Sequence, residues 1–246
     1  MKSINQIIGR AENLLCVVDR CGLENEICSG KYYTVKQREK QRLIIYDWLK
    51  LNNYIQFMTS SERRLFEKKV GNPLIKYTCH KKFFESEAIE PLLWTLGLIK
   101  KLSSYEKYTL TSSKDFDQVH SKLKVDVPNT HQELLREVIV QNEKDILLQN
   151  QIAMLWYWRA IEGNKPMSKK IYTPKKVLDV FGSGYEDAIK YIFSEPSQRD
   201  FKVGKKYVYE LNFKEVQHLY KRAKWRYYAF EWLLSEDDWE NVQLNT

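Results

Sequence analysis

The stretch INQIIGRAENLLCVV, residues 4–18, decides the fold class, because its apolar residues recur every three or four positions. That spacing places them on one face of a helix, so the stretch predicts an amphipathic helix. The same spacing recurs after a cap formed by Thr34 and Gln37, and again over 213–234. The sequence therefore predicts a mainly α fold, a single multi-helix globular domain.

A small β-hairpin is expected near the C-terminal third of the chain. Residues 201–209 alternate between apolar and polar side chains around Gly204, which is typical of two short strands joined by a turn. An apolar helix is also expected over 83–99, with Pro91 either bending it or marking its true start.

The chain divides into two parts by pattern alone. Residues 1–33 are expected to form an N-terminal amphipathic helix and a loop, and residues 34–246 a helical domain. Within that domain, a flexible basic loop at 163–173 is the best candidate for a boundary. Thr173 and Pro174 then give the cap and the first position of a further helix.

Composition and hydropathy indicate where the protein is located, but they say little about its function. The chain has 246 residues, 43% of them hydrophobic and 29% charged, with a net charge of +8. This charge permits contact with nucleic acid or an acidic partner without requiring either. No stretch stays apolar for the roughly 20 residues that cross a bilayer, and the polar start argues against a signal peptide. We therefore expect a cytoplasmic protein without membrane contact.

The chain contains four cysteines: Cys16, Cys21, Cys28 and Cys79. Without a secretion signal, they are expected to be free thiols. Their gaps are wider than the spacing of about two to four residues in common zinc sites, even with His80 beside the last cysteine. The histidines fall in no metal-binding or nucleophile motif. The sequence therefore predicts no metal site and no cofactor.

Three segments together resemble a known family. They are ESEAIEPLLWTLGLI (85–99), MLWYWRA (154–160) and YYAFEWLLSEDDWENVQLNT (227–246). In this order and spacing they are similar to a bacterial family called domain of unknown function 4272, over residues 37–246. The resemblance implies a helical fold and a bacterial or phage origin, and it implies no activity.

The chain departs from that family pattern at several positions. Glu85 stands where the family pattern has Arg, Pro91 lies inside a helix, Glu231 replaces Asn and Asn245 replaces Asp. A shared site built on those polar positions would be altered here. Glu87, by contrast, matches the Glu of the family.

Glu87 is the main catalytic candidate, with Glu90 one turn away and Arg159 on the Trp-rich helix. Glu87 lies among apolar residues, and a buried carboxylate needs a partner or a raised pKa. We expect Arg159 to be that partner. In the functional alternative, Glu87 acts as an acid or the pair holds a substrate; in the alternative that we favour, the two form a buried ion pair that fixes helix packing. Glu87 and Glu90 lie on one helix face, where two carboxylates could act as acid and base or bind a divalent cation. A solvated or capping role is commoner for such glutamates.

Two basic clusters are candidates for nucleic-acid binding, because cations neutralise phosphates and rings stack on bases. The first cluster comprises Lys165, Lys169, Lys170, Tyr172, Lys175 and Lys176. The second runs from Lys205 to Arg226 and includes Lys221, Arg222, Lys224 and Arg226. The favoured alternative is that these lysines are solvated and the rings face the core, since no recognised nucleic-acid module is present.

The function expected from the sequence is that of a non-enzymatic helical protein-interaction module of a bacterial or phage system, with a protein partner. Nucleic-acid binding through the two basic clusters is the alternative, and an enzyme with a Glu87-centred site is the least favoured. The acidic C-terminal segment around Trp239 either docks a partner or, as the resemblance favours, folds back onto the basic clusters.

Overall fold

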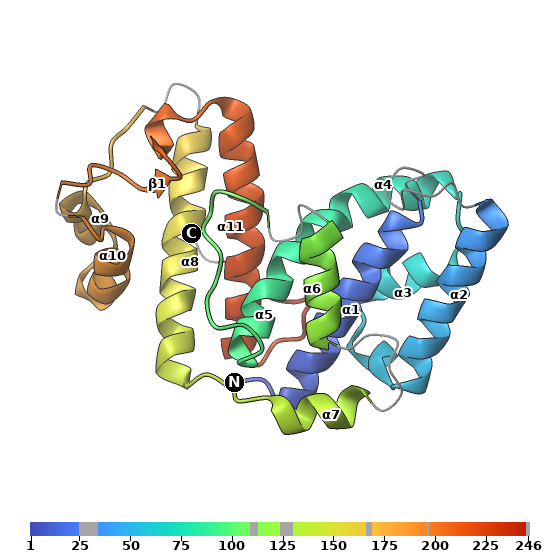
Figure 1. The fold of residues 1–246 in the computed structure, drawn as a ribbon. Coiled ribbons are helices and arrows are strands. Elements are labelled where there is room, and N and C mark those ends of the chain that lie inside the picture. The colour runs from blue at the N-terminus through green and yellow to red at the C-terminus, as the bar shows by residue number, and fades with distance from the viewer. Residues whose placement is uncertain (25–33, 109–112, 124–129, 166–168, 196, 245–246) are drawn as a thin grey trace.

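A computed structural model describes residues 1–24, 34–108, 113–123, 130–165, 169–195 and 197–244. In chain order the elements are α1 (Ile4–Gly22), α2 (Val35–Leu51), η1 (Tyr54–Phe57), α3 (Ser60–Glu67), α4 (Pro73–Lys82), η2 (Phe83–Ala88), α5 (Ile89–Thr95), α6 (Ser113–Leu123), α7 (Thr130–Glu137), α8 (Glu143–Asn164), α9 (Pro174–Phe181), η3 (Ser183–Tyr185), α10 (Glu186–Ile192), β1 (Lys202–Val203), β2 (Lys206–Tyr207), η4 (Val208–Glu210) and α11 (Phe213–Leu234). The fold is mainly helical with an antiparallel β1–β2 hairpin, as the sequence predicts (Figure 1).

The long helices α8 and α11 lie side by side and antiparallel, with α9 and α10 on one side and α1 to α4 on the other (Figure 1). Hydrogen bonds at both ends fix their direction. Gln217 near the start of α11 donates to Asn164 at the end of α8 over 2.5 Å, and Asn150 of α8 donates to Glu231 of α11 over 2.9 Å. Between these ends, Tyr157 packs against two tyrosine rings of α11, so the pair is held by a shared aromatic core.

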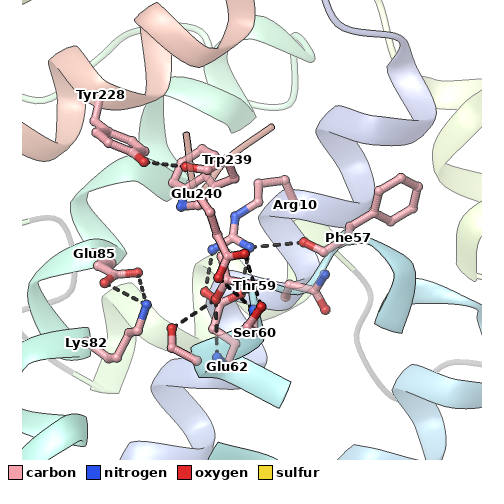
Figure 2. Close-up of polar contacts among 12 residues, drawn as sticks. Arg10, Phe57, Thr59, Ser60, Glu62, Lys82, Glu85, Tyr228, Trp239 and Glu240 are labelled. Carbon is pink, nitrogen blue, oxygen red and sulfur yellow. Dashed lines mark hydrogen bonds and ion pairs between the residues drawn. The ribbon is translucent and has the colours of Figure 1, made fainter. Parts of the chain in front are cut away.

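The predicted first helix forms, but it is buried on its polar side as well as its apolar side. Ile7 and Leu14 enter the core as expected, and Arg10 is also buried. Its guanidinium is held from α3 and η1: Nη1 donates to Glu62 Oε2 over 2.7 Å and to the carbonyl of Phe57 over 3.1 Å (Figure 2). A buried charge is tolerated only with such partners, so α1 and α3 must pack together.

The helix expected over 83–99 is two elements, the 3-10 helix η2 followed by the short helix α5. Pro91 lies in the first turn of α5, where its missing N–H leaves no hydrogen bond unmade, so it marks the start of the helix. The helix stops early because Gly97 has a φ of +70°. A side chain at Gly97 would also collide with the carbonyl of Ile139, so only glycine fits here.

The sequence analysis does not predict α4. In the sequence, Gly71, Asn72 and Pro73 suggest the end of a helix that starts after a cap at Thr59 and Glu62, and the next helix is expected only from residue 83. Asn72 is in fact the cap of α4: its side chain accepts the N–H of Leu74 over 3.0 Å, and Pro73 is the first helical residue. The equivalent Thr-Pro pattern correctly predicts α9. In α4, exposed apolar residues such as Tyr77 hide the amphipathic pattern.

Some organisational predictions concern residues that the structure does not describe. The expected boundary near residue 33 lies outside the described residues and stays a prediction. The basic loop at 163–173 is described except for residues 166–168, and it joins the end of α8 to the start of α9. None of the helices in the described ranges is long and apolar enough to cross a membrane.

The acidic segment after α11 folds back onto α1 and α3 (Figure 2). The Arg10 guanidinium lies 4.3 Å from the centre of the Trp239 ring, and the carbonyl of Trp239 accepts a hydrogen bond from the Tyr228 hydroxyl. Glu240 accepts the N–H of Ser60, at the start of α3, over 2.7 Å. The expected docking onto the basic clusters is therefore wrong, because the segment covers Arg10 and caps α3 instead.

Acid should weaken the buried Arg10–Glu62 pair. Burial alone would raise the pKa of Glu62, but the Arg10 guanidinium, Lys82 and the N–H of Thr59 lower it from 4.5 to about 2. A carboxyl with a depressed folded-state pKa stabilises the fold above its unfolded value and loses that effect as the pH falls. We expect this group to remove about 3 kcal/mol from the free energy of unfolding between pH 5 and pH 2.

Urea unfolding at each pH measures this effect in the unchanged protein and in Glu62→Gln. The variant should be less stable near pH 7, because Arg10 loses its counter-charge, and its unfolding free energy should fall less steeply in acid. Glu186→Gln, on an exposed turn of α10, is the matched control and should keep the original slope. Equal slopes in Glu62→Gln and the unchanged protein would contradict the assignment.

Candidate anion-binding cleft

A cleft of about 610 Å³ opens between the first half of α11, the hairpin and residues 105–108. Residues 105–108 belong to the segment that follows α5 and runs along α8 and α11 (Figure 1). The positively charged cleft residues are Lys107, Lys205, Lys206, Lys214 and Arg222, and the negatively charged ones are Glu106 and Glu215. The cleft thus gathers an excess of positive charge from three separate segments.

Three cleft residues repeat every four positions on α11, and we call them the α11 stripe: Lys214, His218 and Arg222. Residues four apart lie above one another on one face of a helix. The start of the helix is fixed by a capping box, in which Asn212 accepts the N–H of Glu215 over 3.0 Å and Glu215 accepts the N–H of Asn212 over 2.8 Å. Glu215 also pairs with Lys206 of β2 over 2.7 Å, which ties the stripe to the hairpin.

The hairpin turn forms the opposite wall. Val203 pairs with Lys206, so Gly204 and Lys205 form a two-residue turn, and Gly204 has a φ of +59°. A Cβ at Gly204 would lie 2.7 Å from Oε1 of Glu106, so any other residue would also push the end of that side chain aside. Glycine therefore permits both the turn and its contact with the wall at 105–108.

Arg222 forms the floor of the cleft and is only 3% exposed. Its Nη1 donates to the carbonyl of Tyr105, and its Nε lies 3.9 Å from Oε2 of Glu87. The guanidinium also lies 4.6 Å from the centre of the Tyr108 ring. These contacts hold the buried edge of the guanidinium in one orientation.

Behind this floor, Arg226 holds both candidate carboxylates. Its Nη2 lies 3.5 Å from Glu87 and 2.8 Å from Glu90, and its Nη1 donates to the carbonyl of Ser103 over 2.7 Å. Glu90 in turn accepts the N–H of Ser103 over 2.6 Å. Glu87 is 1% exposed, so the carboxylates serve as buried counter-ions to α11.

The predicted Glu87–Arg159 pair is wrong. Arg159 instead pairs with Asp200, with Nε and Nη2 donating over 2.8 and 2.6 Å, and its guanidinium lies 5.0 Å from the centre of the Tyr172 ring. The reason is geometric: Arg159 points from α8 toward the segment before the hairpin, whereas Glu87 lies beneath α11. Nothing in the pattern around Asp200 marked it as a buried partner.

Burial and the neighbouring positive charges shift the pKa values of two cleft residues, His218 and Arg222. Burial lowers the pKa of His218, and the charges of Lys214, Lys221 and Arg222 lower it further. Burial also lowers the pKa of Arg222, while Glu87 opposes that shift. Burial and neighbouring cations therefore act in the same direction on His218, and both favour its neutral form.

The structure separates the predicted basic residues by location. The exposed ones are Lys165, Lys169, Lys170, Lys175 and Lys176. Tyr172 is half-buried, and both its hydroxyl and Lys165 bind Glu162. Lys221 and Lys224 lie over aromatic rings of Phe84 and Trp225. Arg222 and Arg226 are buried, so they are not part of an exposed basic face.

Several cleft residues were not among the predicted site residues. The spacing of Lys214, His218 and Arg222 was visible in the sequence as a repeat of four, and this signal was available. By contrast, no local pattern marked Lys107 or Tyr108, because they reach the cleft only through the path of the chain after α5.

The described residues contain no group of three metal-binding side chains. Cys28 and the side chain of His80 lie outside the described residues. Cys21 and Cys79 meet in the core, where their hydrogen bond and burial raise the pKa of Cys21. The same hydrogen bond lowers the pKa of Cys79. Cys16, Cys21 and Cys79 are buried free thiols, as the sequence predicts.

The family model of a domain of unknown function, DUF4272, matches residues 1–171. The chain belongs to the DUF4272 family. The DUF4272 match starts at residue 1, earlier than the predicted likeness over 37–246, and it includes the cleft wall at 105–108. The hairpin and α11 lie beyond the matched DUF4272 residues. No curated protein and no solved structure matches the chain.

His218 should titrate below its ordinary pKa of 6.5, and Lys214→Glu should raise its pKa. The reason is that the variant replaces a repelling cation four residues away with an attracting anion. Ring-proton NMR measures the titration, with Lys36→Glu on the distant helix α2 as the matched control. If the pKa of His218 is the same in both variants, the α11 stripe does not set the potential of the cleft.

Proposed function

We propose that this DUF4272 protein is a non-enzymatic binding protein that holds an acidic segment of a protein partner in the basic cleft. The observation that carries the proposal is the convergence of Lys107, Lys205 and Lys214 on one cleft above a buried arginine. These lysines are exposed, so their charges are available to a ligand. Complementary charge of this kind steers a partner and fixes its orientation.

The burial of the Glu87 and Glu90 carboxylates favours a binding role over catalysis. A catalytic acid or base must come within hydrogen-bonding reach of a substrate. Glu87 and Glu90 are buried against Arg226, and Arg222 lies between Glu87 and the cleft. This arrangement favours a packing role for both glutamates.

The mixed lining of the cleft favours a protein segment as the ligand. Sites for nucleic-acid strands follow the backbone with a continuous positive groove. Here Glu106 and Glu215 interrupt the positive charge, and Val203, Leu211 and Leu219 add apolar wall. Such a lining suits a peptide, whose charged and apolar side chains alternate.

Nucleic-acid binding is the second candidate, and one observation favours it. Lys169, Lys170, Lys175 and Lys176 are exposed, with no acidic residue between 165 and 178. Against it, the Tyr172 ring already packs on Trp158 and its hydroxyl is bonded to Glu162, so the ring is engaged within the fold. The bacterial or phage system in which either role operates stays a prediction.

Affinity capture from the native host, with and without nuclease, tests the proposal. We expect a stoichiometric protein partner that survives nuclease and binds at least about tenfold more weakly to Lys107→Glu/Lys205→Glu/Lys214→Glu, since three favourable charges become repulsive. The control, Lys169→Glu/Lys170→Glu/Lys175→Glu, has the same change in net charge and should bind normally.

Two results would overturn the proposal. In one, the partner binds the cleft variant as tightly as the unchanged protein. In the other, nuclease removes everything captured, and the control variant rather than the cleft variant loses binding. The second result would establish the nucleic-acid role of the first basic cluster.

A further inference from the structure

We infer that the α11 stripe is a subsite for a phosphoryl group, and that the acidic segment held in the cleft carries a phosphorylated side chain. This inference rests on the proposed function, because it specifies the chemistry of the segment that the same cleft holds. It concerns Lys214, His218 and Arg222, which the structure places on one wall of the cleft.

The first argument is the fixed guanidinium of Arg222. Tyr105 and Glu87 engage its Nη1 and Nε, and the Tyr108 ring covers one of its faces. Across the described part of the chain, its Nη2 has no hydrogen-bond acceptor. A planar donor held in place beside an open cleft is suited to a phosphoryl oxygen, because little conformational freedom is lost when the ligand binds.

The second argument is the number of donors that line the cleft from the same face of α11. His218 stands one turn and Lys214 two turns from Arg222 toward the start of α11, on the same face. Lys214 has no ion pair with a described residue, and His218 stands beside the Tyr108 ring at 5.3 Å. A phosphoryl group offers three acceptor oxygens, enough for one donor from each member of the stripe.

The third argument is charge. Of the two carboxylates in the cleft, Glu215 is already paired with Lys206. Arg222 is paired with Glu87 behind the floor of the cleft. Among the lining residues, Lys107, Lys205 and Lys214 then face only Glu106, so a ligand with two negative charges balances the cleft better than a single carboxylate. A phosphorylated side chain carries a charge of about −1.5 to −2 at neutral pH.

Three peptides of nine residues, identical except at the centre, test the inference. Each has glutamates around a central phosphoserine, glutamate or serine. We expect fluorescence anisotropy to show that the phosphoserine peptide binds at least about tenfold more tightly than the glutamate peptide. That preference should disappear in Lys214→Gln and in His218→Gln, both of which alter side chains that are not buried.

Lys221→Gln is the matched control, because it removes the same charge from the same helix at a residue that does not line the cleft. It should keep the preference. The ring signals of His218 give a second measurement: the phosphoserine peptide should raise its pKa more than the glutamate peptide does. Either a loss of preference in Lys221→Gln or equal effects of the two peptides on His218 would contradict the stripe as the subsite.

The remaining outcomes separate this inference from the proposed function. If glutamate and phosphoserine peptides bind equally and Lys214→Gln weakens both, the phosphoryl subsite is wrong and the acidic-segment proposal stands. If inorganic phosphate alone binds as tightly as the phosphoserine peptide, the ligand is free phosphate and the phosphorylated-segment inference is wrong. If no peptide binds, or binding ignores the cleft variants, both are wrong.

Discussion

Two arginines of α11, Arg222 and Arg226, are buried against Glu87 and Glu90, and the rest of the structure is arranged around this contact. The glutamates lie on η2 and α5, so the ion pairs hold α11 to a part of the chain more than a hundred residues earlier. Removing one partner of such a cluster leaves an uncompensated charge and costs about 3–5 kcal/mol. The same cluster orients Arg222, so the floor of the cleft is fixed by the core rather than by the surface.

Much of the helical architecture could be predicted from local signals, because caps and apolar spacing act within a few residues. The bounds of α11 and the position of the hairpin agree with the prediction. The prediction failed where the signal was not periodic, as in α4, because Asn72 and Pro73 can mark either the end of one helix or the start of the next. It also failed for the partners of Glu87 and Arg159, because an ion pair between distant segments depends on the path of the chain.

The candidate site shows the same division. The stripe of Lys214, His218 and Arg222 follows from the period of one helix and could have been found in the sequence. The wall at 105–108, with Tyr108 and Lys107, depends on how the segment after α5 returns toward the hairpin. In the sequence, Glu87 among apolar residues and Arg159 on a Trp-rich helix are candidates for a catalytic or substrate-binding pair. In the structure both are buried in ion pairs with other residues, so both serve the packing of the helices. The cleft residues Lys107, Lys205 and Lys214, in contrast, are exposed, so their charges do not serve the packing of the core.

The contacts of the C-terminal segment also bear on the order of folding. The N–H of Lys2 bonds to the carbonyl of Leu233 over 3.0 Å, and the Trp239 ring covers Arg10. Contacts between such distant residues form slowly, because a long loop must close before they are gained. During synthesis, part of the surface of α1 therefore stays exposed until α11 and the segment that follows it have emerged from the ribosome. Until then, chaperones have access to a surface that the finished protein hides.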